Sequence, residues 1–427
     1  MAGIETVEVY LDTDRRTNPD LMGTLHCQRS GKGELFSFKY AKTWLARAEV
    51  FAFDPDLALD EGHQYPSADR SNFGIFTDSA PDRWGRVLMQ RRENLRARHE
   101  GLRPRSLTEW NFLLGVHDET RLGALRFKLL DGPYVDSDTK LVAPPLTSLR
   151  ELQAASLQFE QHLNDEEHPE YEKWLLQLIA PGSSLGGARP KASVRDEKGA
   201  LSIAKFPSRQ DTRDVGAWEL VANALALKAG IEVPDARPLR FAESAFTTFL
   251  VKRFDRTAEG GRLAFVSAMT LTQRKDGEAG ASYIELVELL QSRGADTLAD
   301  CEQLFRRVLL NIRIHNTDDH LRNHGFFVDQ QGVRLSPAYD INPSVDRNEL
   351  SLAIDETETT CDVAVAMNAY KSYGLSAAQA DTALKSIEAA VKDWRAEATR
   401  FGIPRAEQNI MAAAFEPADL GRRNGLA

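Results

Sequence analysis

Acidic, amide and imidazole side chains gather in one short segment of the chain, His315-Asn-Thr-Asp-Asp-His-Leu-Arg-Asn-His324. Transfer of a phosphoryl group needs a carboxylate that accepts the proton of the attacking hydroxyl and an amide oxygen that helps to hold Mg²⁺. Protein kinases place the two as D-x-x-x-x-N. Asp318 and Asn323 have this spacing, whereas Asp319 is one residue too close. The spacing therefore predicts Asp318 as the base.

The same segment has two other interpretations. The imidazoles of His315, His320 and His324, with the two aspartates, could bind zinc or another transition metal. However, the pair of histidines at 320 and 324 encloses no glutamate of the HExxH kind, and Asn323 would then have no role. A polar cluster that only stabilises the fold is the other alternative.

A second acidic position follows in the run Ser336-Pro-Ala-Tyr-Asp-Ile341, which we expect to be short and strand-like. Kinases place a metal-binding aspartate after the catalytic loop. The order of the two motifs therefore predicts Asp340 as a Mg²⁺ ligand together with Asn323. An isolated Tyr-Asp pair is common, so the prediction depends on that order.

Lys205 lies inside an apolar run, Leu201-Ser-Ile-Ala-Lys-Phe206, and the next helix carries Glu219. A buried ammonium needs an anionic partner, because burial of a lone charge costs several kcal/mol. Kinases pair a strand lysine with nucleotide phosphates and with a helix glutamate. The alternative is a lysine at a strand edge whose amine reaches water.

A glycine-rich segment precedes this lysine and runs Gly182-Ser-Ser-Leu-Gly-Gly-Ala-Arg-Pro-Lys191. Adjacent glycines let backbone N–H groups approach an anion closely, as phosphate-binding loops require. The segment is neither a Walker loop nor the usual GxGxxG of kinases. A glycine hairpin turn without a ligand is therefore the alternative.

The order of predicted elements indicates an α+β protein with three parts. We expect a β-rich domain at 1–145, a strand–helix–strand lobe at 146–254 and a mainly helical lobe at 255–427. Short strands are expected at 7–11, 22–25 and 35–38, and further strands within 183–206 and 247–254. A segment at 73–92 should begin extended and become a basic helix after Ala80-Pro81, with a solvated face. Helices are expected at 149–178, at 215–229 and from 283 onward, with a loop-rich interruption at 315–342.

Composition excludes several classes of function. The 427 residues carry a formal net charge of −10, so direct, sequence-specific DNA binding by this chain is not expected. The first residues have no apolar core, and no stretch reaches the roughly 20 apolar residues of a membrane span. Three distant cysteines, Cys27, Cys301 and Cys361, form no disulfide framework or metal pair. We expect a cytoplasmic protein.

Together these motifs resemble the HipA family of bacterial toxin kinases. The resemblance runs through most of the chain, and its specific motifs are SAPDRWGR at 79–86, SSLGGARPKA at 183–192, IAKFP at 203–207, VKRFDR at 251–256, TDDHLRN at 317–323 and AYDI at 338–341. It implies a two-lobed protein-kinase-like fold related to lipid and aminoglycoside kinases. The β-rich accessory domain would pack on the small lobe. The Asp340-Ile-Asn sequence departs from the Asp-Phe-Gly of eukaryotic kinases, so the Phe-dependent switch of those enzymes is not expected.

The resemblance also implies the roles of residues in an ATP and Mg²⁺ site between the lobes. ATP phosphates would meet the loop residues Gly186, Gly187, Ala188, Arg189, Pro190 and Lys191, together with Lys205. Backbone groups of Lys252, Arg253 and Phe254 would meet adenine. Asp318 would be the base, His320 and Asn323 would support nucleotide and metal, and Tyr339 with Asp340 would complete the Mg²⁺ site. Ser184, or failing that Ser183, would be the site of autophosphorylation that disables ATP binding.

The implied activity is that of a serine/threonine protein kinase that restrains growth. Its substrate would be a cellular protein such as an aminoacyl-tRNA synthetase, and a small helix-turn-helix antitoxin similar to HipB would supply DNA binding. Two alternatives remain: a catalytically weak co-repressor scaffold with a kinase fold, and a small-molecule phosphotransferase.

Overall fold

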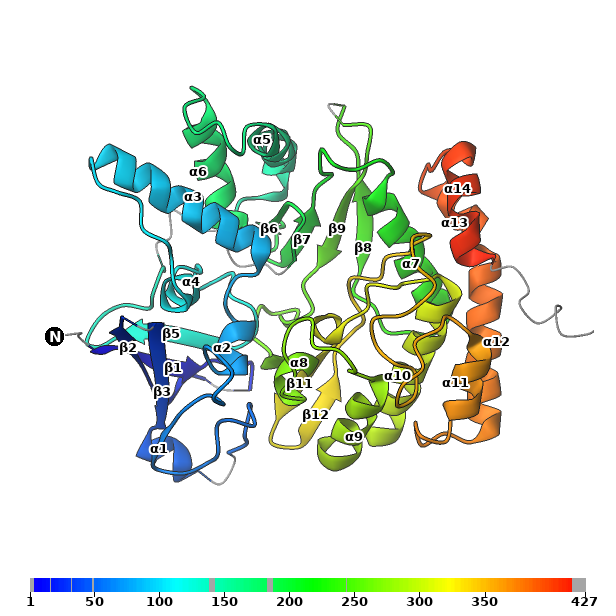
Figure 1. Cartoon of the computed structure of the whole chain (residues 1–427), viewed down its shortest axis with the longest axis horizontal. Helices are drawn as coiled ribbons and strands as arrows, with labels where there is room; N and C mark the ends of the chain where they lie inside the picture. The colour runs from blue at the N-terminus through cyan, green and yellow to red at the C-terminus, as the bar shows by residue number, and fades with distance from the viewer. Residues whose placement is uncertain are drawn as a thin grey trace, which may run out of the picture.

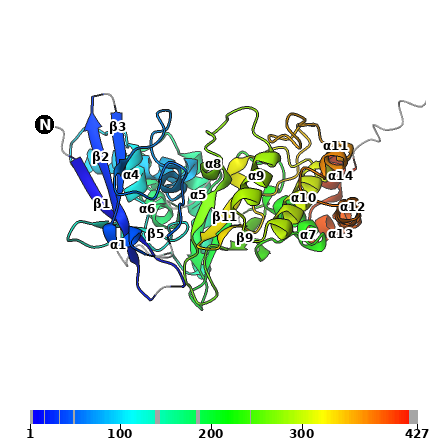
Figure 2. The ribbon, with the colours of Figure 1, turned by 90° about the horizontal axis from the view of Figure 1, so that it is seen from below.

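A computed structural model describes residues 4–15, 17–31, 33–47, 50–137, 143–182, 187–242 and 244–416. Ser183, Ser184 and Gly186, three of the predicted loop residues, lie outside these ranges. Figure 1 shows that a β-rich N-terminal part, a small sheet with its helices and a mainly helical C-terminal part follow one another along the long axis. Figure 2, from below, places β1–β3 near one end and α12–α14 near the other.

The N-terminal part is built on a five-stranded antiparallel sheet with the order β4-β3-β2-β1-β5. Val7, Val9 and Leu11 alternate along β1 and are all buried, as the period-two pattern predicts. The strands expected at 7–11, 22–25 and 35–38 are confirmed, and each is longer than predicted. The strands are β1 (Ile4–Leu11), β2 (Asp20–Ser30), β3 (Gly33–Tyr40), β4 (His63–Gln64) and β5 (Leu125–Leu129).

Four helices separate β3 from β5, and one of them corrects the sequence prediction. They are α1 (Lys42–Leu45), α2 (Gly74–Asp78), α3 (Arg83–His99) and α4 (Glu109–Leu114). The segment from Phe73 was expected to be extended, but it forms α2. Its first turn is held by a distant residue, because the N–H of Ile75 donates to Oδ2 of Asp54 at 2.9 Å. A local sequence pattern does not contain this contact.

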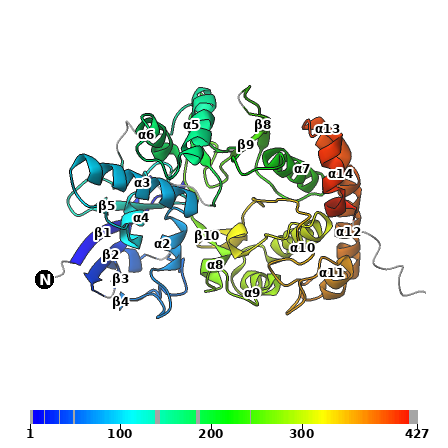
Figure 3. The same cartoon turned by 45° about the horizontal axis from the view of Figure 1, so that its top comes forward.

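The predicted basic helix is α3, which begins at Arg83, two residues after Pro81. Most of its arginines are paired with carboxylates rather than free to meet a nucleic acid: Arg86 with Glu109, Arg91 and Arg98 with Glu166, and Arg96 with Glu93 and Glu100. Its buried side packs against α6, beside the small sheet (Figure 3). Trp84 and Leu88 of α3 share a hydrophobic core with Phe159, Tyr171 and Val194.

The middle part is a four-stranded antiparallel sheet with the order β6-β7-β9-β8. Its elements are η2 (Leu146–Ser148), α5 (Leu149–Gln161), α6 (Tyr171–Gly182), β6 (Lys191–Arg195), β7 (Leu201–Lys205), α7 (Val215–Lys228), β8 (Ala236–Leu239) and β9 (Thr248–Lys252). The strand–turn–strand and the helix from Val215 are confirmed. The helical stretch expected at 149–178 consists of two helices, because the polar stretch between Gln161 and Tyr171, which contains Pro169, interrupts it.

The C-terminal part is mainly helical, as predicted, but it also contains a three-stranded sheet that the sequence reading missed. Its elements are β10 (Phe265–Ser267), α8 (Ala268–Leu271), α9 (Tyr283–Arg293), α10 (Thr297–Arg313), η3 (Leu321–Asn323), β11 (Gly325–Asp329), β12 (Gly332–Leu335), α11 (Val363–Ala369), α12 (Ala377–Lys392), α13 (Trp394–Arg400) and α14 (Arg405–Phe415). β11 and β12 form a hairpin inside the stretch expected to be loop. The run 336–341, expected to be strand-like, belongs to no strand.

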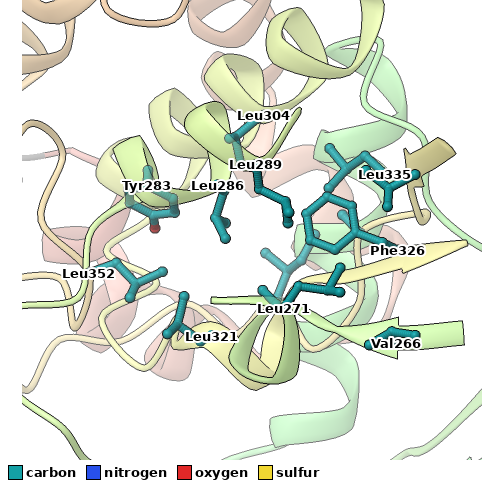
Figure 4. Close-up of a cluster of buried hydrophobic side chains, with 14 of the residues drawn as sticks. Val266, Leu271, Tyr283, Leu286, Leu289, Leu304, Leu321, Phe326, Leu335 and Leu352 are labelled. Carbon is teal, nitrogen blue, oxygen red and sulfur yellow. The ribbon is translucent and has the colours of Figure 1, made fainter. Parts of the chain in front are cut away.

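A hydrophobic core lies directly beneath the segment around residue 320 (Figure 4). Leu321 of η3 contributes to it, together with Leu271 of α8, Leu286 of α9 and Phe326 of β11. Because Leu321 is only 6% exposed, it fixes the backbone between Asp318 and Asn323. In the part of the chain that the structure describes, no helix combines the length and apolar character needed to cross a membrane.

Candidate active site

Lys205, the last residue of β7, joins two carboxylates from different parts of the fold. Its Nζ donates to Oε1 of Glu219 at 2.5 Å and to Oδ1 of Asp340 at 2.8 Å. Although burial opposes the charged amine, the charges of Asp340 and Glu219 raise the pKa of Lys205 above its ordinary value. The structure thus brings together three residues predicted from two separate motifs, the Lys205–Glu219 pattern and the run that contains Asp340.

Glu219 is held in place by the packing of α7. The helix begins at Asp214, whose carboxylate accepts the N–H of Ala217 at 3.1 Å. Helix α14 braces it from outside, because Oε1 of Glu407 accepts both the N–H of Asp214 and the indole N–H of Trp218, at 2.9 and 2.7 Å. Burial raises the pKa of Glu219, so its ionised form depends on the ammonium of Lys205.

Asp340 has an unusual backbone conformation. Its φ is +59°, in the left-handed region that non-glycine residues seldom adopt. The side-chain amide of Asn342 donates to Oδ1 of Asp340 at 3.0 Å. The charge of Lys205 holds the pKa of Asp340 well below its usual range. The residue therefore presents an ionised, partly exposed carboxylate.

The two neighbouring aspartates of the catalytic-loop motif have opposite environments. Asp318 is exposed, and its carbonyl accepts the side-chain amide of Asn323 at 3.1 Å. Asp319 is buried, and its Oδ2 lies 2.6 Å from the Tyr283 hydroxyl and 2.8 Å from Nδ2 of Asn311. Only Asp318 has a carboxylate open to a substrate, which supports the choice made from the spacing.

The histidines of this segment point to separate partners. His324 Nε2 lies 2.8 Å from Asp319 Oδ2, and the His315 ring lies between the Ala414 carbonyl and Asn348 Oδ1, at 2.9 and 3.1 Å. No group of three or more His, Cys, Asp or Glu side chains able to hold a metal occurs among the described residues. The zinc interpretation therefore has no support. His320 is half-buried beside Asp319, and its Nδ1 is enclosed without a hydrogen-bond partner in the described structure.

The described part of the glycine-rich loop begins at Gly187, with φ of +89°. This left-handed backbone favours glycine, and a Cβ atom added there would also lie 2.4 Å from Nζ of Lys191, which would have to move. Burial and the nearby charge of Lys205 lower the pKa of Lys191 to about 8. Ala188 is exposed, and Pro190 accepts the N–H of Phe206.

Arg189 faces away from the two lysines. Its guanidinium makes a two-pronged pair with the Asp211 carboxylate, at 2.7 and 2.6 Å. The loop therefore places Lys191, and not Arg189, beside Lys205.

The residues predicted to meet adenine, 252–254, differ in their exposure. Lys252 is exposed, whereas the Arg253 guanidinium is buried and donates to Asp255 and to the Thr120 carbonyl of the N-terminal part. The Arg253 N–H is already bonded to Leu201 O. The Phe254 ring packs against the Tyr339 ring, with centroids 5.3 Å apart, and the Tyr339 hydroxyl donates to Arg322 O at 2.7 Å. Phe254 and Tyr339 thus form one wall next to Asp340.

Two residues at this site were not found from the sequence. Asn342 supports Asp340, and its N–H donates to Oδ1 of Asn316 at 3.2 Å. Asp82 of α3 accepts the N–H of Gly187 at 2.7 Å. The Asp-x-Asn spacing at 340–342 was a usable signal for the first. Asp82 is 105 residues from Gly187 along the chain, and the sequence marks it only as part of the motif at 79–86.

Comparison with known proteins places this geometry in a family. Residues 183–394 match the family model described as the HipA-like C-terminal domain. A protein of Sinorhizobium fredii (strain NBRC 101917 / NGR234) named "Putative kinase Y4mE" is 25% identical over 158 residues, which cover 35% of this chain and 36% of that protein. The chain thus matches about a third of the length of this relative.

The fold is shared almost from end to end with a solved structure. A chain in the complex of HipA, HipB and operator DNA from the Shewanella oneidensis MR-1 toxin–antitoxin system is similar with a TM-score of 0.63 and 18% identity. The similarity covers 96% of this chain and 95% of that one, so the α+β, kinase-like architecture includes the N-terminal part. Residues 183–394 thus form a HipA-like C-terminal domain, and the chain shares the fold of this solved structure almost from end to end.

Proposed function

We propose that this protein is an ATP-dependent serine/threonine protein kinase. The observation that carries the proposal is the position of Lys205 between Glu219 and Asp340. Active kinases need both the strand lysine–helix glutamate pair and the metal-binding aspartate in place. A scaffold that had lost catalysis would have no need for this arrangement, in which two carboxylates and one amine are held together by three separate segments.

The side chains present fit a Mg²⁺ ion bound with nucleotide phosphates. Mg²⁺ prefers oxygen ligands and is commonly held by one or two carboxylates plus phosphates. Asp340 offers an ionised, partly exposed carboxylate. Asn323 offers its side-chain amide oxygen, because the NH₂ group of the same amide already donates to Asp318 O. When bound, the ion would neutralise charge on the phosphates.

The remaining residues supply charge and proton transfer. Lys191 and Lys205 place two amines beside the loop that would hold the phosphates. The exposed Asp318 carboxylate would accept the proton of a serine or threonine hydroxyl, and the hydroxyl oxygen would form the new bond to the γ-phosphorus of ATP. The bond from that phosphorus to the β,γ-bridging oxygen would break, and ADP would leave. Backbone groups of residues 252–254 would meet adenine, and Tyr339 would stand beside Asp340 at the Mg²⁺ end of the site.

Regulation is the finer part of the proposal. Ser184, with Ser183 as the second choice, would be phosphorylated by the kinase itself, which would place about −1.5 to −2 charges next to the triphosphate. The solved relative is in a complex with HipB and operator DNA. A helix-turn-helix antitoxin would be the partner of this chain and would supply the DNA binding that a net charge of −10 disfavours.

The test is turnover of ATP with Mg²⁺ by the purified protein, with Asp318→Asn as the matched inactive variant. Transfer of labelled phosphate to serine or threonine of a protein, lost in the variant, is the expected result. Transfer only to a metabolite would instead identify a small-molecule phosphotransferase. Equal or absent turnover in both proteins would refute the kinase and favour the scaffold.

A further inference from the structure

Asp82 joins the N-terminal part to both loops of the proposed active site. It precedes α3, and its Oδ1 accepts the N–H of Arg83 at 2.8 Å. Its Oδ2 accepts the N–H of Gly187 in the glycine-rich loop at 2.7 Å. NH1 of Arg322, between Asp318 and Asn323, lies 3.2 Å from Oδ1. A single carboxylate thus contacts three segments that are far apart in sequence.

Trp84, in the first turn of α3, adds two more contacts to the same loop. The N–H of Trp84 donates to Gly187 O at 3.1 Å, and its indole N–H donates to Lys191 O at 3.2 Å. Both backbone groups of Gly187 are therefore bonded to the start of α3. The loop and Lys191 are held by the N-terminal part and not only by their own strand.

The start of α3 is itself rigidly placed. Trp84 is 5% exposed and packs edge-on against Phe159, with ring centroids 6.1 Å apart. Leu88, one turn further along α3, is fully buried in the same core. Because this core also contains residues of β6 and β7, α3 and the small sheet form one packed unit.

The contact with Arg322 extends the connection to the other lobe. The Arg322 carbonyl accepts the Tyr339 hydroxyl, and Tyr339 precedes Asp340, the proposed Mg²⁺ ligand. Displacement of Arg322 would therefore disturb both the loop that contains Asp318 and the backbone next to Asp340. Although burial favours the protonated acid, the N–H of Gly187 and the charge of Arg322 lower the pKa of Asp82, so the carboxylate is ionised.

We infer that Asp82 is a positioning residue for nucleotide binding, which holds the glycine-rich loop at Gly187 and the catalytic loop at Arg322 in a fixed relation. The inference rests on the proposed function, because it assigns to the N-terminal part the task of shaping the phosphate site. It is a positioning role, since Asp82 acts through the Gly187 backbone and the Arg322 guanidinium.

The experiment compares Asp82→Ser and Asp82→Asn with the wild-type protein. Serine and asparagine both cap helices well, so α3 keeps its first turn. Serine removes the charge and is too short to span to Gly187, whereas asparagine keeps the length. Asp276→Ala is the matched control, because it removes the other, exposed carboxylate near Arg322, at 3.6 Å.

Two measurements are made on each protein. Amide hydrogen exchange at Gly187, without nucleotide, reports the contact directly and needs no activity. Steady-state kinetics separates KM for ATP from kcat. A hydrogen bond to a charged group stabilises the bonded state more than a neutral one does. In Asp82→Ser, the exchange rate at Gly187 and the KM for ATP should therefore each rise by about tenfold. Asp82→Asn should be intermediate, and kcat should fall by less than about threefold in both.

The outcomes separate this inference from the proposed function. Faster exchange at Gly187 with an unchanged or lower KM for ATP would overturn the positioning role alone. Unchanged exchange in Asp82→Ser would overturn it as well, as would an equal effect of Asp276→Ala. A wild-type protein that binds no ATP would overturn the proposed function and the inference together.

Discussion

The Nζ atom of Lys205 lies 2.8 Å from Oδ1 of Asp340, so the last residue of a small-sheet strand and an aspartate of the helical part share one ion pair. The pair spans the two lobes, and Glu219 competes for the same amine. Each carboxylate therefore depends on Lys205 for its charge balance, and this dependence can be measured.

Replacement of Lys205 by methionine should abolish phosphotransfer and lower stability. The loss leaves Glu219 buried without a cation, which costs about 3 kcal/mol by analogy with broken buried pairs. The double variant Lys205→Met/Glu219→Gln should recover most of that stability, because the buried carboxylate is gone, while activity stays absent. Thermal denaturation and an ATP-turnover assay give the two readings. Recovery of activity in the double variant would contradict a phosphate-binding role for Lys205.

The two adjacent aspartates should separate catalysis from folding. Asp318→Asn should leave the melting temperature unchanged, since the side chain is exposed, and should lower turnover by about 10²–10⁴-fold, because an amide cannot accept the hydroxyl proton. Asp319→Asn should lower stability by about 1–3 kcal/mol, because it disturbs the bonds of Tyr283, Asn311 and His324. An active Asp318→Asn protein would show that the base lies elsewhere.

Nucleotide affinity should depend on pH through Lys191. Its pKa in the free protein is lowered to about 8, so below pH 8 the amine is charged and attracts phosphate, and above pH 8 the charge is lost. The phosphates of a bound nucleotide raise this pKa, so affinity should weaken by up to about tenfold per pH unit above 8. Isothermal titration of a non-hydrolysable ATP analogue between pH 7 and 9.5 measures this. Lys191→Arg should give a flat profile over that range, since arginine stays protonated; a pH dependence that persists in this variant would point to another group.

Incubation of the protein with ATP and Mg²⁺ should place a phosphate on Ser184. Repulsion between phosphoserine and the triphosphate should then lower ATP affinity. Mass spectrometry locates the modified residue, and affinity is compared before and after; Asp318→Asn, which should not modify itself, is the control. If the loop serines stay unmodified, or if the phosphorylated protein binds ATP as tightly as before, self-inhibition through this loop is excluded.

The sequence predicted the proposed catalytic residues, but not the long-range contacts that hold the surrounding segments in place. Lys205, Asp318 and Asp340 were predicted because each belongs to a motif with local spacing, and the structure brings Lys205 and Asp340 into contact. Asp82 and the Asp54 contact that starts α2 were missed, because they join segments that are distant along the chain. The β11–β12 hairpin was missed because polar residues dominate the stretch around it, although Phe326, Val328, Val333 and Leu335 are all buried.

Helix α14, near the end of the described chain, holds the start of α7, the helix that carries Glu219. Its Glu407 completes the start of α7, and its Phe415 packs against Trp218, with ring centroids 5.7 Å apart. The ribosome makes α14 after every residue from Lys205 to Asp340, so an emerging chain has all of its proposed catalytic side chains before the helix that carries Glu219 is fully braced. A nascent copy should therefore phosphorylate nothing until α14 has left the exit tunnel and packed against α7.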